Sequence, residues 1–157
     1  MSTTITAAPG TPYIDIVREF DAPAAAVFRA HTDPDLYRQW VGPRGLEMEV
    51  LEFEAITGGR WQYVHRNADG AYGFRGVFHT VRSDELIVQT FEFDGAPDNV
   101  VISTAAFSEH DGRTRLTVHE VYPTVEARDM AVASGMEYGI VEGYERLDEL
   151  LGADASV

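Results

Sequence analysis

Two different hydrophobic periods divide the chain. Between residues 45 and 123 apolar and polar side chains alternate, beginning with Leu46, Met48 and Val50, which are separated by glutamates. A period of two is typical of β-strands with one buried face. Turn-forming residues interrupt it at regular intervals, which predicts six strands in an antiparallel meander. We expect these strands near residues 46–50, 61–65, 72–81, 85–93, 100–109 and 113–122.

Helical patterns lie on both sides of the meander. A β-rich segment over residues 13–20 predicts a first strand, and the acidic Asp21 followed by a proline predicts the start of a short helix over 24–31. A second short helix is expected from Asp33 to Gly42. After Thr124, a good helix cap, apolar residues recur at helical spacing as far as Leu151. The order predicts an α+β protein with about seven strands, in which one long helix covers only part of a curved sheet.

The two ends of the chain differ from the region between them. Residues 1–12 are small and polar and contain Pro9, Gly10 and Pro12, so we expect a flexible arm there. Residues 152–157 have a similar composition and predict a flexible tail. Residues 13–151 contain no linker and no internal repeat, which indicates a single domain.

Charge and missing residue types exclude several chemistries. All 12 basic residues are arginine and 26 are acidic, so the net charge is −14, which opposes binding to nucleic acid or to an anionic membrane. Without lysine there is no Schiff base, and without cysteine no thiol nucleophile, disulfide or thiolate metal site. The N-terminus lacks the features of a signal peptide, and no apolar run is long enough to span a membrane. A cytoplasmic protein without a cofactor is expected.

Several motifs together resemble one known family. The first set is Gln39–Gly45 (QWVGPRG), Gly58–Trp61 (GGRW) and Glu120–Pro123 (EVYP). The second set is Glu126–Asp129 (EARD), Ala133–Met136 (ASGM) and Glu142–Leu147 (EGYERL). Over residues 13–151 the chain is similar to the bacterial branch of the heat-shock protein 90 ATPase activator family, which includes relatives of the calicheamicin self-resistance protein.

The resemblance implies a fold rather than one activity. The family belongs to the START or birch-pollen-allergen-like (SRPBCC) superfamily, which implies a helix-grip fold with a cavity between the sheet and the long helix. Lipid carriers, hormone receptors, aromatases and polyketide cyclases share that fold.

Aromatic residues are the first candidates for a binding site. Alternation places Trp61, Tyr63 and His65 on one side of their strand, where they either pack in the core or form the wall of a cavity. In the strand over 85–93 the sequence does not show which alternate residues point inward, because both of its faces carry apolar residues. The ligand-binding candidates are Phe28, Trp40, Trp61, Tyr63, His65, Phe74, Phe107, Glu120 and Met136.

Glu120 is a candidate whose side chain could take part in a reaction. It shares a strand face with Leu116 and Val118, so it is expected to point inward. A buried carboxylate needs a partner or must become neutral, and we expect an ion pair with Arg128. The alternative is a cavity acid or base, for which Glu120 and His65 are the catalytic candidates.

The remaining motifs bear on metals and on assembly. The five histidines lack metal-ligand spacing, so no metal site is expected. Gly135, Gly139 and Gly143 line one helix face, which indicates that a ligand, the sheet or another subunit approaches it closely. These glycines, together with exposed apolar residues near the termini, predict a homodimer.

Three functions remain open, in this order of preference. The first is binding of a small apolar or aromatic molecule for transport, sequestration or sensing. The second is an enzyme of the cyclase, aromatase or hydrolase type that uses Glu120 or His65 as the acid–base group. The third is a chaperone cofactor or another protein-interaction module.

Overall fold

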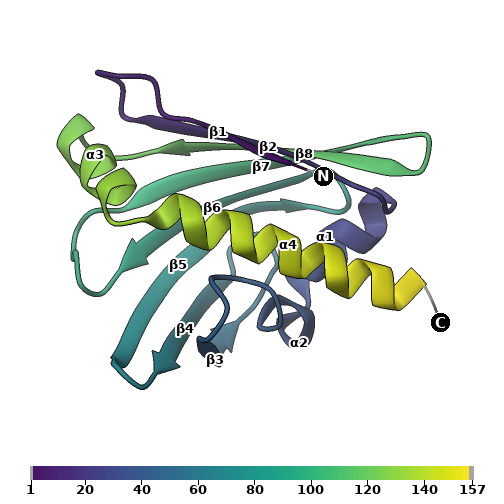
Figure 1. Cartoon of the computed structure of the whole chain (residues 1–157), viewed down its shortest axis with the longest axis horizontal. Helices are drawn as coiled ribbons and strands as arrows, with labels where there is room; N and C mark the ends of the chain where they lie inside the picture. Colours follow the sequence, from purple (N-terminus) through teal and green to yellow (C-terminus); the bar gives the residue numbers. More distant parts are fainter. Residues whose placement is uncertain (1, 156–157) are drawn as a thin grey trace.

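The structure is a computed structural model that describes residues 2–155, and it contains one eight-stranded antiparallel sheet. The strand order is β1-β2-β8-β7-β6-β5-β4-β3 (Figure 1). The strands are β1 (Thr3–Thr6), β2 (Tyr13–Phe20), β3 (Glu47–Phe53), β4 (Arg60–Asn67), β5 (Gly70–Arg82), β6 (Leu86–Phe93), β7 (Val101–His110) and β8 (Arg113–Val121). The helices are α1 (Ala24–Thr32), α2 (Pro34–Tyr37), α3 (Val125–Ala133) and α4 (Met136–Ala155).

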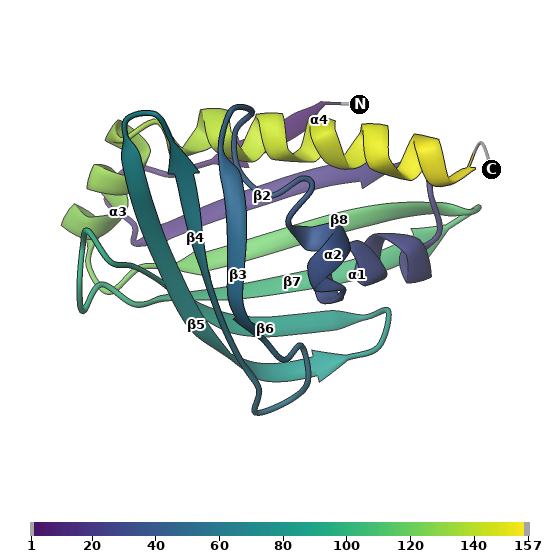
Figure 2. The ribbon, with the colours of Figure 1, turned by 90° about the horizontal axis from the view of Figure 1, so that it is seen from below.

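The sheet curves around the long helix α4. Strands β3, β4 and β5 run steeply across the direction of β2, β7 and β8, and α4 lies along the concave side (Figure 2). Helices α1 and α2 close one end of this concave side, beneath the C-terminal half of α4. The predicted α+β class is confirmed, the arrangement is that of a helix-grip fold, and the predicted meander is formed by β3 to β8.

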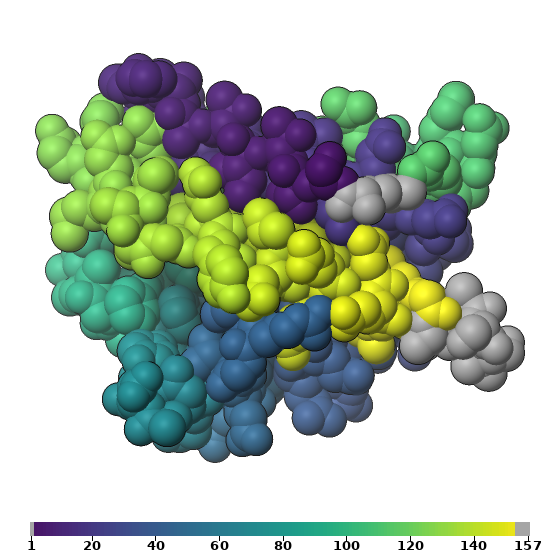
Figure 3. All heavy atoms as spheres, in the orientation of Figure 1, coloured from purple at the N-terminus to yellow at the C-terminus, as the bar shows by residue number. Residues whose placement is uncertain are grey.

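The sheet has one strand more than the seven expected. Thr3–Thr6 form β1, which pairs with β2 so that Thr3 lies opposite Arg18. The prediction of a flexible arm over 1–12 is therefore wrong for these residues. The outer edge of β2 presents main-chain groups that need partners, and the short β1, with Ile5 as its one apolar residue, satisfies them. Figure 3 shows this purple segment lying along α4.

The long helix expected from Thr124 to Leu151 is interrupted. Thr124 Oγ1 accepts a hydrogen bond from the Ala127 amide at 3.0 Å, so the predicted cap is confirmed. Helix α3 then ends at Ala133, and Gly135 adopts a φ of +85°, a left-handed conformation that suits glycine and ends helices. Helix α4 starts directly after it and continues to Ala155, into the segment expected to be a tail, of which residues 156 and 157 lie outside the described part.

The glycine face of α4 packs against the loop that follows α2. A Cβ atom at Gly143 would lie 3.1 Å from the Trp40 carbonyl oxygen, and one at Gly139 would lie 3.4 Å from Pro43 Cδ. The expected close approach exists, and residues 40–43 of the same chain make it. The expected homodimer stays a prediction and must use a different surface.

Candidate functional site

A row of aromatic side chains on β4 faces the inside of the sheet. Trp61, Tyr63 and His65 are all buried, and their rings contact one another with centroid separations of 5.4 and 4.9 Å. The predicted alternation is confirmed, and only 4% of His65 is accessible. Tyr37 from α2 lies 6.0 Å from Tyr63, ring to ring, and extends the row.

Two polar atoms of this aromatic row have no hydrogen-bond partner within residues 2–155. They are Nε1 of Trp61 and Nε2 of His65, and both are buried. Glycines make room for the two rings: a Cβ at Gly76 would lie 2.6 Å from Trp61 Nε1, and one at Gly42 would lie 2.7 Å from His65 Cε1. Burial lowers the pKa of His65, so this ring is held in its neutral form.

Three of the predicted lining residues belong to the packed end of the interior. Phe28 contacts Phe107 edge to face at 5.3 Å, and Trp40 stacks on Tyr144 at 5.8 Å. The Trp40 indole N–H also donates to the Ala30 carbonyl at 2.9 Å. We call this region beneath α1 the closed end. Its aromatic side chains are packed against one another, and the indole N–H of Trp40 is hydrogen-bonded. A role for Phe28, Trp40 and Phe107 in ligand binding stays a prediction.

The other end of the interior is less tightly covered. Beneath the first half of α4, inner-face residues are only partly buried. We call this region the open end. Its inner-face residues are Phe74, Gln89, Phe91, Phe93, Ser103, Glu120, Met136 and Ile140. The predicted residues Phe74 and Met136 belong to this open end, and their role in ligand binding stays a prediction.

A polar row crosses the open end. Gln89 on β6 lies directly opposite Ser103 on β7, and Ser103 lies opposite Glu120 on β8. Side chains that lie opposite each other in an antiparallel pair share a face, so all three point inward. In the described chain neither Gln89 nor Ser103 forms a side-chain hydrogen bond. The row therefore offers free donors and acceptors to a ligand.

Glu120 is the one acidic member of this row. The Tyr122 hydroxyl donates to Glu120 Oε1 at 3.5 Å, and burial raises the pKa of this carboxyl to about 7. The predicted ion pair with Arg128 is wrong. Arg128 instead donates to the main-chain oxygens of Ala8 and Tyr13, each at 3.0 Å, and pairs with Asp129. Its long side chain fills the gap between α3 and the N-terminal segment, where unpaired carbonyl groups attract it.

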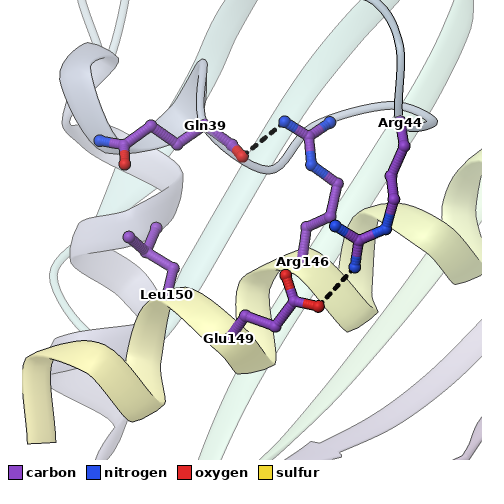
Figure 4. A pocket seen from close by; sticks show the side chains of 5 residues that line it. All are labelled: Gln39, Arg44, Arg146, Glu149 and Leu150. Atoms are coloured by element: carbon purple, nitrogen blue, oxygen red, sulfur yellow. Dashed lines mark hydrogen bonds and ion pairs between the residues drawn. The ribbon is translucent and has the colours of Figure 1, made fainter. Parts of the chain in front are cut away.

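Two surface depressions of the described chain lie elsewhere. One, of about 380 Å³, lies beside α4 and is shown in Figure 4. It is lined by Gln39, Arg44, Arg146, Glu149 and Leu150. Arg146 donates to the carbonyl oxygens of Gln39 at 2.7 Å and Gly42 at 3.2 Å, and Arg44 pairs with Glu149 at 2.5 Å. Both arginines already have partners. Through these contacts Arg146 holds the 39–43 loop on α4, and neither arginine is left to bind a ligand in this depression.

The second depression, of about 410 Å³, lies between α3 and the N-terminal segment. Its lining residues are Ala7, Pro9, Gly10, Arg128, Asp129, Val132 and Ala133. Arg128 is engaged there by Asp129 and by main-chain oxygens. Neither depression includes a residue of the polar row.

Sequence reasoning missed Gln89 and Ser103. The signal for Ser103 was present, because it alternates with the buried Val101 and Phe107 on β7. For Gln89 the signal was absent, since both faces of β6 carry apolar residues and only the pairing with β7 shows which face is inner. Phe91 on β6, which contacts Trp61, was missed for the same reason, and Tyr37 on α2 contacts Tyr63 only through the packing of α2 on the sheet.

The described chain offers neither a cluster of metal ligands nor a membrane-spanning helix. Within residues 2–155 no three His, Asp or Glu side chains come together as metal ligands would. Over the same range no helix is both long and apolar enough to cross a membrane.

A family model identifies the family of this chain, and solved structures share its fold. The model of the activator of Hsp90 ATPase homolog 1-like proteins matches residues 21–152, and the chain belongs to this family. A crystal structure from Rhodobacter sphaeroides is 27% identical with a TM-score of 0.88, covering 98% of this chain and 99% of the other. Protein Ms6760 from Mycobacterium smegmatis is 25% identical with a TM-score of 0.86 and the same coverage. A comparison with curated protein sequences gives no match.

Proposed function

We propose that this member of the family binds a small aromatic molecule in the open end, between β5–β8 and the first half of α4. One observation carries the proposal: three polar groups on the inner faces of β4, β6 and β7 have no hydrogen-bond partner in the described chain. The indole N–H of Trp61, the Gln89 amide and the Ser103 hydroxyl form no hydrogen bonds within residues 2–155. Trp61 Nε1 is buried, where native proteins pair such groups, and Gln89 and Ser103 are only partly buried, so a ligand could supply the missing partners to all three.

The aromatic walls define the shape of the ligand. Phe74 contacts Phe91 at 5.3 Å and stacks on Phe93 at 5.1 Å, and Trp61 reaches Phe91 at 5.8 Å. All three phenylalanines are only partly buried, so ring surface remains to be covered. A flat aromatic molecule with one polar edge would cover these rings and direct that edge toward the polar row.

Titration with the neutral probe N-phenyl-1-naphthylamine, whose fluorescence rises in apolar surroundings, tests the proposal. We expect saturable binding of one probe per chain. Ser103→Phe would fill the open end and weaken binding at least about tenfold. Thr104→Phe is the matched control, because Thr104 is the next residue on β7 and points to the outer face. Absence of saturable binding, or equal binding by the Ser103 variant, would contradict the proposal.

A second function, proton transfer by Glu120, is favoured by one observation. A carboxyl with a pKa of about 7 is suited to act as a general acid or base at neutral pH. Deuterium exchange at the acidic C–H of 2-tetralone, followed by NMR, would test this role. Loss of protein-catalysed exchange in Glu120→Gln supports catalysis, whereas equal exchange by both proteins leaves binding as the function.

Activation of an Hsp90 ATPase, which the family description names, ranks third for this chain. The observations at the open end concern a small molecule and give no support to a protein partner.

A further inference from the structure

The charges around the open end bear on which aromatic molecules it accepts. Glu120 is the acidic side chain of the polar row, and its one side-chain hydrogen bond comes from Tyr122. No arginine in the described chain forms an ion pair with it. The neighbouring groups are Tyr144 from α4, Ser103 from β7 and Ile14 from β2, and none of them is cationic.

The arginines that are least exposed are all held by other partners. Arg18 pairs with Asp148 at 2.5 Å and donates to the Glu19 carbonyl at 2.6 Å. Arg128 bonds to Asp129 and to two main-chain oxygens, and Arg146 holds the 39–43 loop. The interior therefore has a carboxyl group available for a ligand and no available guanidinium.

Two further features of the protein also give a negative electrostatic potential. The faces of aromatic rings carry negative potential, so the rings of Trp61, Phe74 and Phe91 attract a cation placed over them. The whole chain carries a net charge of −14, which concentrates cations and repels anions near its surface. The available carboxyl, the ring faces and the net charge thus all favour a positive ligand.

We propose that the open end selects an aromatic molecule that carries an amine over one that carries a carboxylic acid. The inference rests on the proposed binding function. The ammonium group pairs with the Glu120 carboxylate and is flanked by the Ser103 hydroxyl and the Gln89 amide oxygen. The aromatic part of the ligand lies against Phe74 and Phe91. A carboxylic acid in the same place would meet Glu120 with like charge.

Three matched probes test the selectivity by calorimetry at about pH 8. Naphthylethylamine, naphthylethanol and naphthylacetic acid share a ring system and a two-carbon side chain, and they differ in charge. We expect the amine to bind at least about tenfold more tightly than the acid. Glu120→Gln should reduce the affinity for the amine about tenfold and leave that for the alcohol within about threefold, which also reports that the variant is folded.

Glu47→Gln is the control for net charge. Glu47 is exposed on β3 and loses the same single charge, so the ratio of amine to acid affinity should not change. Equal binding of amine and acid, or an equal effect of the two substitutions, would overturn the inference while leaving the binding function intact. Failure of all three probes to bind would contradict the proposed function as well.

Discussion

The Tyr122 hydroxyl lies 3.5 Å from Glu120 Oε1 and 3.5 Å from Met136 Sδ, and it links the last strand to the start of α4. Met136 is the first residue after the Gly135 break, so the break brings the helix start down onto this hydroxyl. Burial and the neighbouring Glu120 raise the pKa of Tyr122 well above its ordinary value. The phenol therefore stays protonated and can continue to donate to the carboxyl.

The raised pKa of Glu120 predicts a pH-dependent stability. The carboxyl titrates near 4.5 in the unfolded chain and near 7 in the folded one. At low pH the carboxyl is protonated in both the folded and the unfolded state, so its ionisation does not change the free energy of folding there. As the pH rises from 4.5 to 7 only the unfolded state ionises, and folding loses up to about 3 kcal/mol. Glu120→Gln should therefore be more stable than the original chain at pH 8 and equal to it near pH 4.

Urea unfolding of the two proteins at both pH values measures this difference. Glu47→Gln removes a charge from an exposed side chain and should show no such pH-dependent gain. A Glu120→Gln variant that is less stable at pH 8 would show that the carboxylate is stabilised inside the fold.

Arg128 and Glu120 are predicted to act independently. Arg128→Met removes the hydrogen bonds to Ala8 and Tyr13 and should destabilise the fold by about 1–3 kcal/mol. Because the two side chains form no ion pair, the double variant with Glu120→Gln should equal the sum of the single effects. A double-mutant cycle by thermal unfolding measures the coupling free energy. A coupling above about 1 kcal/mol would show that Glu120 and Arg128 interact after all.

Two glycines of α4 should respond to alanine with opposite signs. Gly152 faces open space, so Gly152→Ala should stabilise the helix by up to about 1 kcal/mol. Gly143→Ala would place its Cβ 3.1 Å from the Trp40 carbonyl oxygen, and the resulting displacement of the loop should outweigh the gain in helix propensity. Thermal unfolding compares the two variants, and equal stabilisation by both would show that the loop yields freely.

Two arginines at the depression in Figure 4 should differ in importance. Arg146→Leu leaves the carbonyl oxygens of Gln39 and Gly42 without their donor and should cost about 1–3 kcal/mol. Arg44→Leu breaks an exposed pair with Glu149, which solvent screens, and should cost clearly less than Arg146→Leu. Chemical denaturation measures both changes. The order would be reversed if the pair between Arg44 and Glu149, rather than Arg146, held the loop.

The sequence by itself determined the elements and most of their faces. Alternation in Trp61, Tyr63 and His65, and in Leu116, Val118 and Glu120, identified the inner faces of β4 and β8, because a strand buries every second side chain. The helical spacing of apolar residues up to Leu151 indicated the covering helix, and Thr124 marked where the helical segment begins. Alternation and helix capping are local patterns, and a few neighbouring residues are enough to recognise them.

Only the tertiary structure decided the partners of the charged groups and the composition of the site. Arg128 bonds to Ala8 and Tyr13, about 120 and 115 residues away, and no local pattern records such a choice. Gln89 joined Ser103 and Glu120 only through the pairing of three strands, since β6 is apolar on both faces. The strand β1 formed because the edge of β2 needed partners. Each outcome depends on which groups remain unsatisfied once the chain has folded, and that is a property of the whole assembly of elements.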